Sequence, residues 1–194
     1  MTRKILVTGA AGYVGSKLVR HLLSYNYHII GLDSLKYGDE SISQLYNNPY
    51  FVFQKGDIRD FKLIDRIVNE VTDVVHLAAI VGDPACSKMP EEAFEVNWIA
   101  TRYLFDACKN ARNISHFVFA STCSNYGKMD NEEFLNENSE LRPVSLYAKL
   151  KVKFEKYLLK SETRKDFYPT ALRFATIFGA SPRIRFDLTV NEFI

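Results

Sequence analysis

The chain has 194 residues, a formal net charge of +2 at pH 7 and a hydrophobic fraction of 47%. This length suits one domain with a buried core, and the composition is typical of ordinary globular proteins. Basic and acidic residues are interspersed, so we expect no nucleic-acid partner, and no apolar run approaches the ~20 residues that span a membrane.

The three cysteines, Cys86, Cys108 and Cys123, are too few for a disulfide framework. They predict a reducing compartment, and we therefore expect a cytoplasmic protein. The sequence has no CxxC motif and no Cys/His cluster, so we expect no metal site. The basic and apolar start of the chain resembles a signal peptide, but it continues into a glycine turn and a helical pattern, which favours a buried first strand.

Short apolar runs alternate with helical patterns along the chain. In chain order we predict a strand at 4–9, a helix at 13–24, strands at 28–33 and 50–53, a helix at 60–70, a strand at 73–79, a helix at 91–109, a strand at 116–121, a helix at 144–161 and a strand at 170–179. Such alternation predicts an α/β fold in one domain, with a doubly wound parallel sheet of about six strands. The least regular stretches, 34–49, 80–90 and 124–143, are candidate binding loops, because loops after parallel strands lie at one edge of the sheet.

The first strand leads into TGAAGYVG at residues 8–15, with glycines at every third position. Glycine permits a tight turn and a close approach to a pyrophosphate, and the following helix offers free N–H groups and the positive end of its dipole. Asp33 ends the second strand, where a carboxylate binds the adenine ribose of a dinucleotide. This context predicts a Rossmann-type site that favours NAD over NADP, since a carboxylate repels a 2′-phosphate. Lys36 nearby keeps NADP open as an alternative.

Asp57 and Ile58 follow the third predicted strand. Asp57 either caps the helix predicted at 60–70 or lies against the adenine edge of the dinucleotide. The sequence alone leaves both interpretations open.

The stretch YAKLK places Tyr147 and Lys151 four residues apart, and therefore on one face of a helix. An ammonium group beside a phenol favours the phenolate, so we expect Lys151 to lower the pKa of Tyr147 from ~10 and to make it a proton-transfer group near neutral pH. An isolated pattern of this kind fits an ordinary amphipathic helix. The glycine turn and the hydroxyl-rich stretch upstream favour the catalytic interpretation.

Residues 121–127, STCSNYG, follow an apolar strand. They allow three interpretations: a reactive thiol, a hydrogen-bonding shelf for a substrate, or a polar turn. Together with Tyr147 and Lys151, the stretch is interpreted as the hydrogen-bonding shelf for a substrate, and Thr122 as the residue that makes the functional hydrogen bond. Cys123 is then expected to be a small packing residue rather than a nucleophile.

Together these motifs resemble the extended branch of the short-chain dehydrogenase/reductase superfamily, the NAD-dependent nucleotide-sugar epimerases and dehydratases. The resemblance covers the whole chain and rests on TGAAGYVG at 8–15, Asp33, GDIRD at 56–60, HLAA at 76–79, Asn97, STCSNYG at 121–127, YAKLK at 147–151 and LRFATIFG at 172–179. It implies an enzyme that binds NAD and a nucleotide-activated sugar.

The resemblance implies catalytic roles for three residues. Tyr147 would be the general acid/base, Lys151 would lower its pKa and bond the nicotinamide ribose, and Thr122 would hydrogen-bond the reacting oxygen. The other cofactor-binding residues that it implies are Gly9, Gly12, Tyr13, Val14, Asp33, Asp57, Ile58, Leu77, Ala78, Ala79, Asn97 and Phe174. For Asn97, on the apolar face of its predicted helix, a structural role that ties this helix to the neighbouring strand is the alternative.

The chain also departs from the family pattern. Cys123 and Ser124 stand where the sugar 4,6-dehydratases of this branch have acidic residues that eliminate water, so dehydration is disfavoured. Thr176 stands where many 4-epimerases have an asparagine that contacts the substrate phosphate. The family members are longer, and we expect residues 180–194 to be the start of a truncated substrate-binding region.

The leading functional hypothesis is therefore an NAD-dependent 4-epimerase that acts through a transient 4-keto sugar. Net oxidoreduction of a keto-sugar by the same residues is one alternative, and a non-catalytic NAD-binding module without a substrate lobe is the other. We expect the chain itself to bind NAD with little or no turnover. Family members pair through two helices each, so we expect a homodimer through residues 91–109 and 144–161, whose outer faces carry Trp98, Tyr103 and Tyr157.

Overall fold

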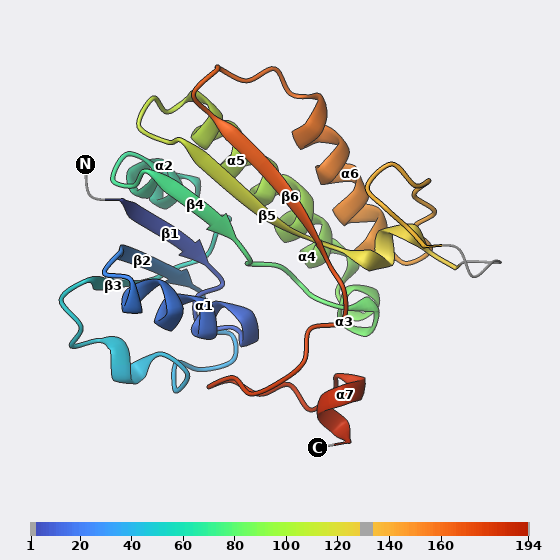
Figure 1. Cartoon of the computed structure of the whole chain (residues 1–194), viewed down its shortest axis with the longest axis horizontal. Helices are drawn as coiled ribbons and strands as arrows, with labels where there is room; N and C mark the ends of the chain where they lie inside the picture. Colours follow the sequence, from blue (N-terminus) through green and yellow to red (C-terminus); the bar gives the residue numbers. More distant parts are fainter. Residues whose placement is uncertain (1–2, 129–133, 194) are drawn as a thin grey trace.

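The computed structural model describes residues 3–128 and 134–193, which fold around a sheet of six parallel strands (Figure 1). The strands lie in the order β3-β2-β1-β4-β5-β6, the order of the doubly wound Rossmann fold, which reverses between β1 and β4. Their bounds are Lys4–Thr8 (β1), His28–Asp33 (β2), Phe51–Lys55 (β3), Asp73–His76 (β4), His116–Thr122 (β5) and Tyr168–Phe174 (β6). The predicted α/β fold is confirmed.

Helices cover both faces of this sheet. The helices are α1 (Tyr13–Ser24), α2 (Phe61–Val68), α3 (Asp83–Lys88), α4 (Pro90–Phe94), α5 (Thr101–Asn110), α6 (Leu146–Lys160) and α7 (Thr189–Glu192), with a π-helical segment, η2 (Glu95–Ala100), and short 3₁₀ turns at Ser43–Leu45 and Cys123–Tyr126. In Figure 1, α1 lies on one face, whereas α2, α5 and α6 lie on the other.

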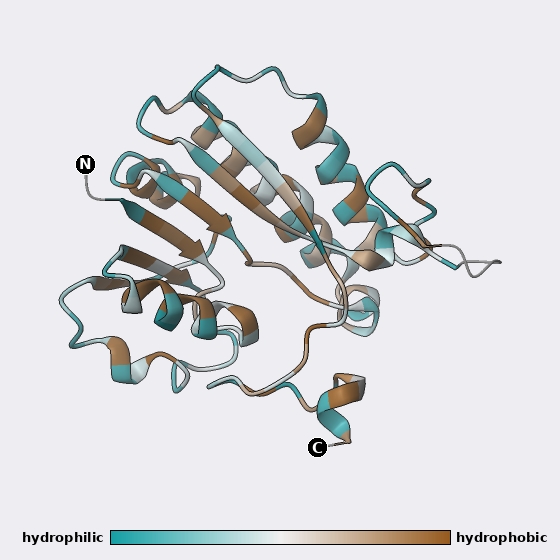
Figure 2. Ribbon diagram, in the orientation of Figure 1, coloured by the Kyte–Doolittle hydropathy of each residue, from teal (hydrophilic) through white to brown (hydrophobic). Residues whose placement is uncertain are grey.

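Alternate residues of the strands feed the two halves of the core, as the period of a strand requires. Leu6 of β1 is buried in the larger cluster, among side chains of α2, α5 and α6. Its neighbours Ile5 and Val7 are buried in a second cluster with Val19 and Leu23 of α1. Because both faces are covered, β1 and β2 are hydrophobic over most of their length (Figure 2).

Two strands are shorter than predicted at their carboxyl ends. β4 ends at His76 rather than at residue 79, because the Ala78 N–H donates to the Thr8 side-chain oxygen (3.2 Å) instead of continuing the ladder. β6 spans Tyr168–Phe174 rather than 170–179, since its partner β5 ends at Thr122, directly opposite Phe174. In both places the chain leaves the sheet at the edge where the candidate site lies.

The region predicted as a loop and then one long helix, 80–109, is more broken than expected. Part of the predicted loop 80–90 forms α3, which begins after Gly82 at a φ of 89°. The helix predicted at 91–109 runs from α4 to α5 through the π-helical segment. There the Thr101 hydroxyl donates to the carbonyl oxygen of Val96, five residues earlier (2.9 Å), which stabilises the wider turn.

The helix cap proposed at Asp57 is wrong. Asp60 caps α2, since its side chain accepts the N–H of Leu63 at 3.1 Å. Asp57 instead accepts the backbone N–H of Arg59 (2.8 Å) and pairs with the guanidinium of the same residue (2.7 Å). A cap must directly precede the first helical residue, and Asp57 lies too far from Phe61.

The last described segment returns to the start of α1. The Tyr13 hydroxyl donates to the Gly179 carbonyl (2.7 Å), and the Ser181 hydroxyl donates to the Tyr13 carbonyl (2.6 Å). These bonds hold residues 179–181 beside the glycine turn; that residues 180–194 begin a substrate-binding region stays a prediction. Within residues 3–128 and 134–193, none of the helices has the length and apolar character that a bilayer crossing requires.

Candidate active site

A cavity of about 650 Å³ lies at the carboxyl ends of the strands. Residues that directly follow or end each of the six strands line it, as expected for a ligand site in a doubly wound sheet. The predicted site residues that line it are Gly9, Gly12, Tyr13, Val14, Asp33, Asp57, Ile58, Leu77, Ala78, Ala79, Thr122, Tyr147, Lys151 and Phe174. Asn97 is the one predicted site residue outside this lining.

The glycine turn leaves no room for side chains on its inner side. Gly9 has a φ of 72°, and a Cβ there would approach the Ala78 nitrogen to 2.9 Å. A Cβ on Gly15 would lie 2.0 Å from the Gly9 carbonyl oxygen. Tyr13 and Val14 occupy the first turn of α1, where N–H groups have no partner within the helix. The glycines thus let the turn pack closely against the backbone, and the free N–H groups at the start of α1, which line the cavity, suit a pyrophosphate.

Asp33 is held in place at the end of β2. One carboxylate oxygen accepts the N–H of Ala11 in the glycine turn (3.0 Å), and the other accepts the N–H of Leu35 (2.9 Å). Lys36 lines the same cavity, but its ammonium group is paired with Glu92 at 2.9 Å. A fixed carboxylate with its nearest lysine engaged elsewhere favours a ribose with a free 2′-hydroxyl over a 2′-phosphate.

Asp57 and Ile58 form the neighbouring wall. The hydrogen bond from Arg59 lowers the pKa of Asp57, so its carboxylate is ionised at neutral pH. Ile58 is buried in the larger core cluster while one side reaches the cavity. This pairing of an acceptor with an apolar surface is compatible with an adenine ring.

Asn97 has the structural role that was the alternative for it. Its side-chain oxygen accepts the Ile80 N–H, and its side-chain nitrogen donates to the Ile80 carbonyl, both at 2.9 Å. The side-chain amide is buried, and both of its ends bond the backbone of one residue, Ile80. Asn97 therefore fixes the loop after β4, next to the cavity-lining residue Ala79, without lining the cavity itself.

The hydroxyl shelf lies where β5 ends. Thr122 is nearly buried, and its hydroxyl oxygen accepts the Ser124 N–H (3.1 Å) while the residue lines the cavity. Cys123 is exposed and also lines the cavity, so its expected role as a packing residue is wrong. It lies in the 3₁₀ turn that turns the chain out of the sheet, away from the core.

Tyr147 and Lys151 both line the cavity, but the pKa of Tyr147 is raised and not lowered as expected. Burial, together with the nearby Cys86, raises the pKa of Tyr147 to about 12, and Arg185 acts in the opposite direction. Burial also lowers the pKa of Lys151 to about 8. The Lys151 ammonium donates to the Ala120 carbonyl at 2.7 Å and lies 5.7 Å from the centre of the Tyr147 ring. Desolvation therefore dominates both pKa shifts.

A buried ion pair, which the sequence motifs did not predict, joins α6 and β6 and holds the end of β5. Glu155 of α6 is buried, and one of its oxygens is bound by the guanidinium of Arg173 of β6. The other oxygen accepts the Ser121 hydroxyl (2.7 Å) and the Asn125 amide (3.1 Å), which flank Thr122. Glu155 lies four residues beyond Lys151, so this continuation of the Tyr147 and Lys151 spacing was the signal available in the sequence.

The segment at residues 183–188 also lines the cavity, although none of its residues was among the predicted site residues. Arg183 lies over the ring of Tyr37, with 4.2 Å between the guanidinium carbon and the ring centre. Arg185 is paired with Asp187 at 2.6 Å. Residues that are distant in sequence thus meet at the cavity, which a local motif cannot reveal.

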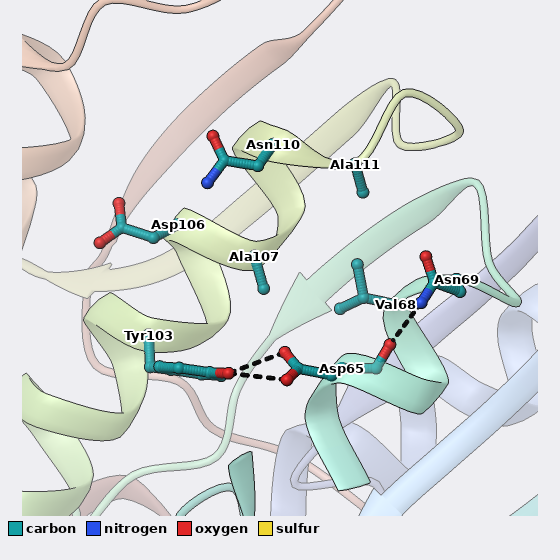
Figure 3. A pocket seen from close by; sticks show the side chains of 8 residues that line it. All are labelled: Asp65, Val68, Asn69, Tyr103, Asp106, Ala107, Asn110 and Ala111. Atoms are coloured by element: carbon teal, nitrogen blue, oxygen red, sulfur yellow. Dashed lines mark hydrogen bonds between the residues drawn. The ribbon is translucent and has the colours of Figure 1, made fainter. Parts of the chain in front are cut away.

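A second hollow, of about 420 Å³, lies between α2 and α5 (Figure 3). Its two carboxylates are already bound: the Tyr103 hydroxyl donates to Asp65 (2.8 Å), and the Tyr157 hydroxyl donates to Asp106 (2.7 Å). It contains none of the predicted site residues. Within the part of the chain that the structure describes, no group of three or more His, Cys, Asp or Glu side chains could hold a metal ion.

The fold and the cavity define a dinucleotide-binding Rossmann domain whose cavity is also lined by a Thr, a Tyr and a Lys. The sequence profile described as the NAD dependent epimerase/dehydratase family matches residues 5–194, and the chain belongs to this family.

Relatives and solved structures agree with this assignment. The chain is 31% identical to a UDP-glucose 4-epimerase of Lactobacillus helveticus over 180 residues, which make up 92% of this chain and 53% of that protein. It resembles the crystal structure of UDP-glucuronic acid 4-epimerase from Bacillus cereus in complex with NAD, with a TM-score of 0.85, 30% identity and coverage of 97% of this chain and 60% of the other. It also resembles the UDP-glucose 4-epimerase of Thermus thermophilus in complex with NAD, with a TM-score of 0.79, 31% identity and coverage of 91% and 56%. The chain thus spans about half the length of the curated relatives that it matches.

The buried ion pair predicts that neutralising Glu155 destabilises the fold more than neutralising an exposed glutamate does. Glu155→Gln leaves the Arg173 charge without its carboxylate in a buried place, and we expect the free energy of unfolding to fall by about 3 kcal/mol. Glu140→Gln, which breaks an exposed pair with Arg142 (2.8 Å), is the matched control, and we expect a loss below about 1 kcal/mol. Urea denaturation measures both. Equal losses would contradict the structural role of the buried pair.

The opposite pKa shifts of Lys151 and Tyr147 predict a maximum of stability in alkaline solution. Between the folded pKa of about 8 and the ordinary value of 10.5, the unfolded lysine binds more protons than the folded one, so stability rises with pH. Between 10 and about 12 the unfolded tyrosine loses its proton first, so stability falls. Urea midpoints measured against pH should show the rise in the unaltered protein and not in Lys151→Met. The control Lys153→Met, an exposed site on α6, should keep it; a rise that survives in Lys151→Met would exclude this origin.

Proposed function

We propose that the protein binds NAD and acts in the 4-epimerisation of a nucleotide-activated sugar. The observation that carries the proposal is that one cavity joins two groups of residues. The glycine turn and Asp33 form one part of its lining. Thr122, Tyr147 and Lys151 form another. The relatives named above are UDP-sugar 4-epimerases, and two of the solved structures contain NAD. The family assignment and the cavity therefore support the same proposal.

The proposed roles divide the cavity into a cofactor part and a reactive part. The N–H groups at the start of α1 bind the pyrophosphate, Asp33 binds the adenine ribose, and Leu77, Ala78 and Ala79 line the cofactor between them. NAD bound there would supply a reversible acceptor for the hydride of a sugar carbon. Phe174 lines the same cavity at the end of β6.

The reactive part moves one proton. Tyr147 exchanges the proton of the sugar hydroxyl at its phenol oxygen, while Thr122 holds the reacting oxygen through its hydroxyl. Burial keeps the phenol protonated, and the positive charge of Arg185 favours its ionisation. Cys123 and Ser124 offer no carboxylic acid for elimination of water, which favours epimerisation over dehydration.

Calorimetry with NAD and NADP tests the cofactor proposal. We expect the unaltered chain to bind NAD more tightly than NADP, and Asp33→Asn to weaken NAD about tenfold, because a hydrogen bond to a charged group is lost. Asp39→Asn is the matched control, since Asp39 lies in the next loop, accepts a hydrogen bond from Tyr46 (2.8 Å) and does not line the cavity. The absence of binding by either dinucleotide would exclude the proposal.

The reaction is tested by proton NMR of UDP-sugars incubated with NAD and a form of the protein as long as its relatives. We expect the two C4 epimers to interconvert without net NADH, and Tyr147→Phe to abolish the exchange. Stoichiometric consumption of NADH with a keto-sugar would instead favour an oxidoreductase.

We further propose a cytoplasmic homodimer through the helices at 91–109 and 144–161. The three cysteines are free thiols, in keeping with a reducing compartment. Side chains on these helices leave apolar surface in solvent, with exposed fractions of 40% for Phe94, 40% for Ile99 and 65% for Leu159. Trp98 and Tyr157 pack against each other, with ring centres 5.9 Å apart, and so brace the two helices.

Light scattering on a gel-filtration column tests the dimer. We expect the unaltered chain to elute as a dimer and Ile99→Glu to elute as a monomer, because the charge would be buried without a partner. Val52→Glu, at a more exposed apolar site on β3, is the control and should leave the mass unchanged. A monomeric mass for the unaltered chain would rule out the dimer.

A further inference from the structure

A chain of hydrogen bonds crosses the sheet beneath the cofactor part of the cavity, with His76 at its centre. His76 ends β4 and is 1% exposed. Its Nδ1 lies 2.7 Å from the Thr8 hydroxyl oxygen, and its Nε2 lies 2.9 Å from the Thr101 hydroxyl oxygen. His76 does not line the cavity, and the proposed reaction does not use it.

The partners of the two hydroxyl groups fix the protonation of the ring. The Thr101 hydroxyl donates its single hydrogen to the Val96 carbonyl (2.9 Å), so towards His76 it accepts, and Nε2 carries the proton. The Thr8 oxygen already accepts the Ala78 N–H (3.2 Å) and shares that of Leu77, so its own hydrogen points to Nδ1. The network thus requires a neutral imidazole with its proton on Nε2. Burial and the nearby Lys151 lower the pKa of His76 to about 3, which agrees with a neutral ring.

Thr8 lies where two walls of the cofactor part cross. It directly precedes Gly9, and a Cβ on Gly9 would lie 2.9 Å from the Ala78 nitrogen, so the glycine turn and the chain leaving β4 are in close contact. The Thr8 oxygen bonds Ala78 at this same crossing. The direction of the Thr8 hydroxyl therefore affects the spacing between the pyrophosphate turn and Leu77, Ala78 and Ala79.

The other end of the chain of hydrogen bonds reaches the π-helical segment. Thr101 bonds the Val96 carbonyl in that segment, which also contains Asn97 and its two bonds to the Ile80 backbone. His76 thus links the glycine turn, the exit of β4 and the helix that holds the following loop.

We propose that His76 is a positioning residue for the dinucleotide, and that it acts through the Thr8 hydroxyl to set the distance between the glycine turn and the Leu77–Ala79 wall. This proposal rests on the proposed binding of NAD. It predicts that the bond donated by the Thr8 hydroxyl to Nδ1 sets the affinity for NAD, whereas the bond donated by Nε2–H to Thr101 mainly anchors the ring.

The ring state is tested first, on the unaltered protein without any ligand. Nitrogen-15 NMR of the histidine side chains at neutral pH should show His76 as the Nε2–H tautomer, with its Nδ1 resonance in the range of an unprotonated acceptor. The resonance is assigned by its loss in His76→Asn. An Nδ1–H tautomer or an imidazolium ion would overturn the proposal, whatever the affinity for NAD.

Two substitutions of His76 separate its two bonds. The side-chain oxygen of asparagine can replace Nδ1 as the acceptor for Thr8, whereas the longer glutamine reaches the position of Nε2 and Thr101. We expect His76→Asn to keep the affinity for NAD within about threefold and His76→Gln to weaken it about tenfold, the size of one lost hydrogen bond. Equal affinities in the two variants, or a larger loss for asparagine, would overturn the proposal.

A double-mutant cycle separates positioning from a general loss of stability. In a Thr8→Val background, which lacks the hydroxyl, His76→Gln should cost little further affinity for NAD, because the two changes remove the same interaction. Additive losses would overturn the proposal. His116→Gln is the matched control: His116 of β5 bonds Asp73 at 2.7 Å at the opposite end of the strands, so its loss should leave the affinity for NAD unchanged.

The outcomes also distinguish this proposal from the proposed function. If the unaltered protein does not bind NAD, both the cofactor proposal and the role of His76 fall. If it binds NAD and the cycle is additive, only the role of His76 falls.

Discussion

Every part of the candidate site depends on the parallel direction of the six strands. Because all strands run the same way, each leaves the sheet at the same edge, and the register decides which side chains meet there. Thr8 is paired with His76 across one ladder, and Thr122 with Phe174 across another. A slip of one residue in either pair would turn these side chains to the other face of the sheet, so the site exists only in this register.

Two buried polar networks connect the segments that form the two parts of the cavity. His76 links the segments around the cofactor part, and the pair of Glu155 and Arg173 links the shelf, β6 and α6 around the reactive part. Apolar packing alone tolerates small displacements of strands and helices, whereas a hydrogen bond weakens steeply with distance and angle. The networks therefore do more to fix the positions of Thr8 and Thr122 than to raise overall stability.

The sequence predicted those parts of the site whose signals are local. The glycine turn, Asp33 and the spacing of Tyr147 and Lys151 each lie within one turn, strand end or helix, and the structure brings them to one cavity. Asp57 was misread as a cap because composition marks a helix start only to within a few residues.

The missed features all depend on the folded chain. The Glu155 network joins residues on β5, α6 and β6, and the lining at 183–188 comes from a segment that folds back to the glycine turn. The exposure of Cys123 and the burial of Tyr147 are properties of the tertiary structure, which residue type does not determine. The expected phenolate was wrong for this reason: spacing placed the lysine correctly, but burial decided the pKa.

The raised pKa of Tyr147 follows from this burial, and it draws attention to the segment at residues 183–188. A low-dielectric site favours the neutral forms of both the phenol and the ammonium group, so Lys151 loses its proton well before Tyr147 does. A phenolate in such a place needs a positive charge that keeps its proton throughout, which a guanidinium provides and a buried lysine does not. Arg185, which is paired with Asp187, acts on the pKa of Tyr147 in this direction, although burial outweighs it. Because Ser181 and Gly179 are bonded to Tyr13, the segment that contains Arg185 is anchored to the start of α1 beside the glycine turn.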